Sequence, residues 1–125
     1  MQGKTPQEKD EMISEWRRRI QMVAAVDNIF VKLGATAMPD RGFGFDKKPR
    51  PPTSEEMVKA VRPYYQFLIE QFSPKRCMFE SNFPSDKASS NYTVIWNAFK
   101  IMTKSFSKTE RACLFHDTAN RVYNL

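Results

Sequence analysis

The chain of 125 residues has one histidine, His116, and two cysteines, Cys77 and Cys113, which lie far apart in the sequence. A catalytic metal site needs several converging ligands and an open coordination position. These residues do not supply them, and we interpret His116 as a structural or surface residue. No C-x-x-C pair is present, and each cysteine lies in an apolar segment, which predicts two buried thiols in a reducing compartment.

Long apolar runs are also missing. The apolar stretches are far shorter than the roughly 20 residues that a membrane-spanning helix needs, and residues 1–6 contain no apolar signal region. We therefore expect a cytoplasmic protein with no membrane partner. The length indicates one domain or part of one. It is too short for a closed eight-stranded barrel, which takes on the order of 250 residues.

The composition is typical of a packed globular protein, and the net charge is positive. Hydrophobic residues make up 41% and aromatic residues 13%, which argues against a disordered chain. The net charge of +6 makes a small nucleic-acid-binding module one hypothesis. The residues that would bind nucleic acid are Arg17, Arg18, Arg19, Lys47, Lys48, Arg50, Phe43 and Phe45. We favour a solvated helix face and a charged loop instead, because Glu11 and Glu15 lie within helical reach of the first cluster.

Capping residues and apolar periodicity predict four helices and two short strands. Three helices begin at a Thr or Ser followed three positions later by Glu, and one begins at Ser90 or Asn91. The predicted helices are 6–26, 53–72, one that extends to about residue 102 and a last one that begins near 107. The predicted strands are 29–33 and 77–79. Pro63 lies inside the second helix and should kink or split it near Arg62.

Residues 34–52 form a long predicted loop that is rich in glycine and proline. Loops of this length are uncommon in compact domains and are often functional. Phe43 and Phe45 indicate that part of the loop packs against something, so we assign both as candidate substrate contacts in a covering loop. The alternative is an apolar flap that touches no ligand.

Residues 76–87 carry the strongest chemical signal. The apolar strand Cys77-Met78-Phe79 passes directly into the polar turn Glu80-Ser81-Asn82, and α/β enzymes present catalytic groups at such strand ends. Two strands separated by helices imply a parallel pair. A two-stranded parallel sheet cannot cover both of its faces and both of its edges, so the chain is predicted to be a slice of a larger α/β protein.

Several segments resemble the amidohydrolase-related (amidohydrolase 2) family of metal-dependent hydrolases, which have a TIM-barrel fold. The similar segments are 28–34, 76–87, 96–100 and 118–123, and the loop 42–45 with 51–56 resembles one subgroup. The resemblance covers residues 16–125. It implies an α/β fold that is the C-terminal part of a (β/α)8 barrel, with residues 1–125 forming an incomplete barrel.

The resemblance also implies an activity. Family members hydrolyse C–O or C–N bonds in lactone-, ester- or amide-like carboxylated compounds through a water activated by zinc or manganese, and some relatives are decarboxylases. The family's His-x-His and mid-barrel His would precede Met1. We therefore expect this chain alone to bind no metal and to be inactive, and its partners to be a small-molecule substrate and the missing N-terminal barrel half. The alternative is a non-catalytic fragment whose exposed strand edges drive homo-oligomers.

Asn82 stands where the family commonly has an aspartate that serves as metal ligand or general base. An amide oxygen is a neutral ligand and cannot take up a proton, so we assign Asn82 and Asp86 as candidate catalytic residues, with Asp86 or Glu80 supplying the charge. The alternative is that Asp86 caps the next loop and pairs with Lys87. Lys32 interrupts an apolar strand, and a buried charge needs a partner. It either contacts a substrate carboxylate or forms an ion pair with Glu80, and we favour the ion pair. Lys32, Phe43, Phe45 and Glu80 are the candidate substrate-binding residues.

Overall fold

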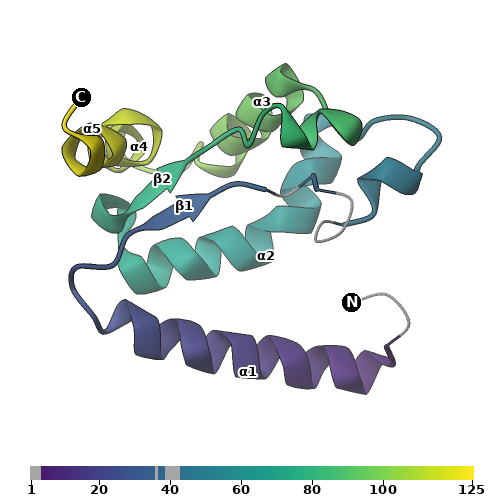
Figure 1. Cartoon of the computed structure of the whole chain (residues 1–125), viewed down its shortest axis with the longest axis horizontal. Coiled ribbons are helices and arrows are strands. Elements are labelled where there is room, and N and C mark those ends of the chain that lie inside the picture. The colour runs from purple at the N-terminus through teal and green to yellow at the C-terminus, as the bar shows by residue number, and fades with distance from the viewer. Residues whose placement is uncertain (1–3, 36, 39–42) are drawn as a thin grey trace.

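The computed structural model of the chain describes residues 4–35, 37–38 and 43–125. Within these residues, two strands and five α-helices follow one another in the order shown in Figure 1. The elements are α1 (Pro6–Ala24), β1 (Val31–Leu33), α2 (Ser54–Phe72), β2 (Cys77–Phe79), α3 (Tyr92–Met102), α4 (Lys108–Ala112) and α5 (Thr118–Tyr123). Residues 1–3 of the N-terminal segment, and Pro39 and Gly42 of the predicted long loop, lie outside the described residues.

α1 begins where the sequence predicts. The Thr5 side chain accepts a hydrogen bond from the Glu8 backbone at 3.2 Å, and the Glu8 carboxylate accepts one from the Thr5 backbone at 2.7 Å. These bonds satisfy N–H groups that the first helical turn leaves without partners. Ala24 is the buried residue of α1, and Trp16 packs edge-on against the Tyr64 ring of α2 at 5.7 Å. The helix therefore lies along the outside of α2 (Figure 1).

β1 and β2 form the parallel pair that the sequence predicts. Val31 lies opposite Cys77 and Leu33 opposite Phe79, and the Glu80 N–H donates to the Leu33 carbonyl at 3.1 Å. The predicted strand 29–33 is too long, because the ladder begins at Val31 and residues 29 and 30 precede its first pair. α2 connects the two strands and packs against both.

α2 is continuous from Ser54 to Phe72. Pro63 therefore does not split the helix, whereas the predicted kink near Arg62 stays a prediction. Proline removes a single N–H donor from the helical ladder. Val61 and Tyr65 lie on either side of Pro63 and are buried at 1% and 7% exposure, and their packing stabilises the helical turns around the interruption.

The C-terminal region packs against β2 through α5 and the turn before it. α3 is capped by the Asn91 side chain, which accepts from Val94 N–H at 2.9 Å. The predicted last helix is present, but a π-helical turn, Cys113–Asp117, separates α4 from α5, and no sequence pattern predicted it.

The core is centred on aromatic rings between the sheet and α3. Phe79 of β2 stacks on Phe99 of α3 with centroids 4.3 Å apart and planes 8° apart, and Phe115 lies 5.0 Å from Phe79. Cys77 and Cys113 are buried free thiols, as predicted. Among the described residues, no helix is both long and apolar enough to cross a membrane.

Candidate functional site

The carboxyl ends of the two strands lie side by side because the strands are parallel and in register. Leu33 and Phe79 point into the core, at 0% and 7% exposure. Side chains alternate along a strand, so Lys32, Met78 and Glu80 belong to the opposite side, which we call the second sheet face. The candidate site is the end of this face together with the turn that follows β2.

Lys32 and Glu80 form an ion pair at the second sheet face, with 2.5 Å between Nζ and Oε2. The hydrogen bond to the Glu80 carboxylate raises the pKa of Lys32 above its ordinary value. Half of the Lys32 side chain is exposed, so solvent screens the pair and its contribution to stability is small. The pairing favoured from the sequence is therefore confirmed, and substrate contact by Lys32 and Glu80 stays a prediction.

Gly34, which directly follows β1, makes room for Glu80. A Cβ atom at position 34 would lie 2.1 Å from Cγ and 2.8 Å from Oε1 of Glu80. The Tyr65 hydroxyl donates to the Gly34 carbonyl at 2.8 Å and holds this part of the chain in place. The absence of a side chain at Gly34 therefore permits the Lys32–Glu80 pair.

We expect Gly34→Ala to displace Glu80 and to lower the free energy of unfolding by about 1–3 kcal/mol, the range for overpacking. Urea denaturation of the chain measures this loss. The matched control is the same change in a Glu80→Ala background, where the obstructing atoms are gone and most of the loss should vanish. An equal loss in both backgrounds would contradict the close approach as its cause.

Asn82 and Asp86 come together in the turn after β2. Asn82 has a positive φ of 55°, a left-handed conformation that asparagine tolerates better than most residues. Its Nδ2 donates to Asp86 Oδ1 at 2.6 Å, and Asp86 Oδ2 accepts from the Ala37 backbone N–H at 3.1 Å. Asp86 is 1% exposed. The structure thus gives the Asp86 carboxylate partners other than Lys87, and its catalytic role stays a prediction.

The two loop phenylalanines have different surroundings. Phe45 begins a short 3-10 helix, Phe45–Lys47, and is 4% exposed within the core. Phe43 is 39% exposed and rests against the rings of Phe45 and Tyr64 at 6.1 and 5.7 Å. The aromatic part of the loop therefore packs down on α2, as the sequence indicated, and Phe43 is the one of the two that a ligand could touch.

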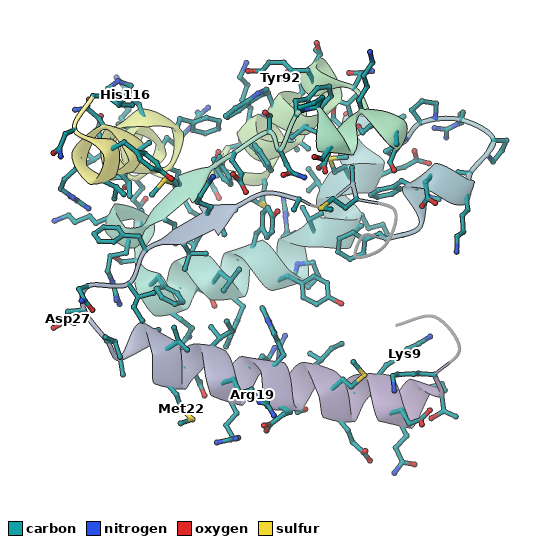
Figure 2. All side chains as sticks on the ribbon, in the orientation of Figure 1. Lys9, Arg19, Met22, Asp27, Tyr92 and His116 are labelled. Atoms are coloured by element: carbon teal, nitrogen blue, oxygen red, sulfur yellow. The ribbon has the colours of Figure 1, made fainter. Side chains whose placement is uncertain are left out.

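The described residues contain no group of three or more His, Cys, Asp or Glu side chains arranged to hold a metal ion. His116 lies on the outer surface of the C-terminal helical region (Figure 2) and contacts Asp117 at 2.9 Å, which confirms its assignment as a surface residue. Burial raises the pKa of Cys77 to about 12, so without a metal its side chain is a protonated thiol at neutral pH.

The basic clusters are partly engaged with acidic and aromatic side chains. Arg18 and Arg19 both bind Glu15, at 2.8 and 2.7 Å, and Arg50 binds Glu56 at 3.0 Å. The pairs of Glu15 with Arg18 and Arg19 are helix-face ion pairs expected from the sequence, whereas the pair of Arg50 in the loop with Glu56 of α2 was not predicted. Nucleic-acid binding by the two clusters stays a prediction.

Comparison with known proteins decides the family. The family model described as "Amidohydrolase" matches residues 2–125 of the chain. The chain belongs to the amidohydrolase family. It is 38% identical over 110 residues to "Uncharacterized protein y4mH" of Sinorhizobium fredii, an alignment that covers 88% of this amidohydrolase chain and 33% of the relative. The chain thus spans about a third of the relative's length.

This chain also matches only part of each similar solved structure. Crystal structures of an amidohydrolase from Burkholderia multivorans, one with bound HEPES and one with bound zinc, superpose with TM-scores of 0.79 and 0.78 at 22% sequence identity. Each alignment covers 93% of this amidohydrolase chain but only 38% and 39% of the Burkholderia chain. The fold of the chain is therefore similar to part of an amidohydrolase fold.

Three contributors to the site of this amidohydrolase chain are not predicted from the sequence: Gly34, the Tyr65 hydroxyl and the Ala37 N–H. The polar tip of Tyr65 on an otherwise apolar helix face is a signal that a buried partner is needed. A backbone N–H such as that of Ala37 leaves no signal in a sequence.

Proposed function

We propose that this chain is the closing part of a hydrolase barrel. It would supply two neighbouring parallel strands with their helices, while the other strands and the histidine ligands come from the part of the relatives that this chain does not match. The proposal is supported by the coverage, which is nearly complete for this chain and little more than a third for the Burkholderia amidohydrolase.

The observation that carries the proposal is the sheet itself. Every strand of a closed barrel has two neighbours, whereas β1 and β2 in the described structure pair only with each other. The second sheet face ends in Lys32 and Glu80, on the side away from the Leu33 and Phe79 core, which is where a barrel presents its substrate-facing groups. Completing the barrel would pair both outer edges and enclose this face.

The residues that the structure describes do not by themselves fit a zinc site. Both oxygens of Asp86 have hydrogen-bond partners, Cys77 is a buried thiol, and Asn82 can offer only a neutral oxygen. Zinc sites in enzymes take three protein ligands of the histidine, cysteine or carboxylate type. We therefore assign the metal ligands to the remainder of the barrel and derive no reaction step through a metal for this chain.

For the complete enzyme we propose hydrolysis of C–O or C–N bonds in small carboxylated compounds of the lactone, ester or amide type. A divalent metal would supply the activated water. This chain would contribute Asn82 at the end of β2 and Lys32, Glu80 and Phe43 as contacts around the substrate. Phe45 and Asp86 are buried, and they would hold the contacting residues in position without touching the substrate.

The test is reconstitution. The 125-residue chain is purified alone and then mixed with the part of the Sinorhizobium relative that it does not match. We expect the chain alone to contain no stoichiometric zinc and to hydrolyse none of a panel of lactones, esters and amides. The mixture should elute as a one-to-one complex and bind zinc. Stoichiometric zinc with turnover by the chain alone would overturn the proposal.

A matched pair of variants examines the outer edge of β1. The Leu33 carbonyl points toward β2, so the peptide groups of Lys32 point to the outer edge. Lys32→Ala and Lys32→Pro both remove the ion pair, but only the proline removes the edge N–H. We expect Lys32→Pro to weaken the complex much more than Lys32→Ala, and equal weakening would contradict edge pairing.

A further inference from the structure

Asp86 connects three separate parts of the chain around a buried charge. Its carboxylate accepts from the Ala37 N–H, in the segment after β1, and from the Asn82 amide, in the turn after β2. Its backbone carbonyl accepts from the N–H groups of Ser89 and Ser90 at 3.1 and 3.0 Å. A carboxylate that is 1% exposed must be compensated by hydrogen bonds, and the bonds from Ala37 and Asn82 do this.

The hydrogen bond to Asp86 also fixes which end of the Asn82 amide faces outward. A carboxylate can only accept, so the Asn82 NH₂ group must be the end that contacts it. The bond is short, at 2.6 Å, as charge-assisted hydrogen bonds are. Asn82 Oδ1 has no partner among the residues that the structure describes.

We infer that Asp86 is a positioning residue that holds the Asn82 amide with its oxygen presented at the end of β2. Position 82 then offers a neutral hydrogen-bond acceptor, which suits a hydroxyl or N–H donor of a ligand and repels a carboxylate. The choice of this ligand class rests on the proposed function, whereas the positioning itself does not.

Positions 82 and 86 pair one hydrogen-bond donor with one acceptor. An aspartate at position 82 would place a second carboxylate against Oδ1 of Asp86, with no proton donor between them. Asn82→Asp should therefore destabilise the chain, and exchanging the two residues, Asn82→Asp with Asp86→Asn, should restore a donor–acceptor pair. In the exchanged variant the amide at position 86 can still accept from the Ala37 N–H through its oxygen.

The decisive measurement is the Asn82 side-chain NH₂ signal in ¹H–¹⁵N NMR spectra of the 125-residue chain. We expect one Asn82 Nδ2 proton to exchange slowly with water. In Asp86→Asn, the Asn82 amide should turn so that its oxygen accepts from the new amide at position 86, and its own protons should then exchange rapidly. Asn97, which is exposed on α3, serves as the internal reference and should not change.

Urea denaturation gives a second, independent readout. Asn82→Asp should lower the folding equilibrium constant by about ten- to a hundredfold, the cost of an unsatisfied buried polar pair, and the exchanged double variant should recover most of it. A double variant no more stable than Asn82→Asp, or an Asn82 amide that exchanges as fast as Asn97, would overturn the inference. Neither result depends on zinc or turnover, so failure here is distinct from failure of the proposed function.

Discussion

Replacing Phe99 with alanine is expected to cause the largest loss of stability in this chain. Phe99 is 0% exposed, stacks on Phe79 at 4.3 Å, and contacts the Trp96 and Tyr65 rings at 5.6 and 6.2 Å. Removing a buried phenylalanine costs about 3–5 kcal/mol, through lost transfer free energy and the cavity that remains. Because small domains are stable by only about 5–15 kcal/mol, we expect a large fraction of unfolded chain at 37 °C.

Thermal denaturation followed by circular dichroism measures this loss. The matched control is Tyr92→Ala, which removes an aromatic ring from the same helix at a position that is 53% exposed (Figure 2). Its ring contacts with Phe83 and Trp96 are at the surface, so a loss of about 1 kcal/mol is expected. Similar losses for the two variants would show that the Phe79–Phe99 stack is not the centre of the core.

Replacing Arg76 with alanine is expected to detach the C-terminal end of α1 from the rest of the fold. The Arg76 guanidinium donates to the carbonyls of Ala24 and Val26 at 2.8 Å and to that of Phe72 at 3.0 Å. Ala24 is the one residue of α1 that is buried, so few other contacts hold this end. Hydrogen bonds from a charged donor contribute about 1.5–3 kcal/mol each. These three are exposed or only partly buried, so water can replace the lost donor, and we expect a total loss of about 2–4 kcal/mol, less than their sum.

Hydrogen exchange resolved along the sequence distinguishes local detachment from global unfolding. In Arg76→Ala, amides of α1 should lose protection first, while amides of β2 and α3 keep most of theirs. Arg76→Lys keeps the charge but lacks the planar fork that reaches several carbonyls at once, and it should recover less than half of the loss. Full recovery by lysine would show that charge alone matters at this position.

The resemblance visible in residues 76–87 predicted the family, and local signals predicted most of the elements. Three capping boxes begin α1, α2 and α4 as expected, because a capping box involves only four consecutive residues. The same locality explains the correct position of β2 and of the turn that contains Asn82. Pro63 does not split α2, since its local penalty is outweighed by packing on both sides of it.

The sequence by itself determined where helices begin, which strands are apolar and that polar side chains follow β2. Only the tertiary structure decided which groups these side chains meet. Asp86 reaches Ala37 across 49 positions and Arg76 reaches Val26 across 50, and Gly34 meets Glu80 because the register of the two strands aligns them. Such contacts depend on how distant segments pack, and the acceptors and donors involved are mostly backbone groups, which every residue carries and no sequence pattern distinguishes.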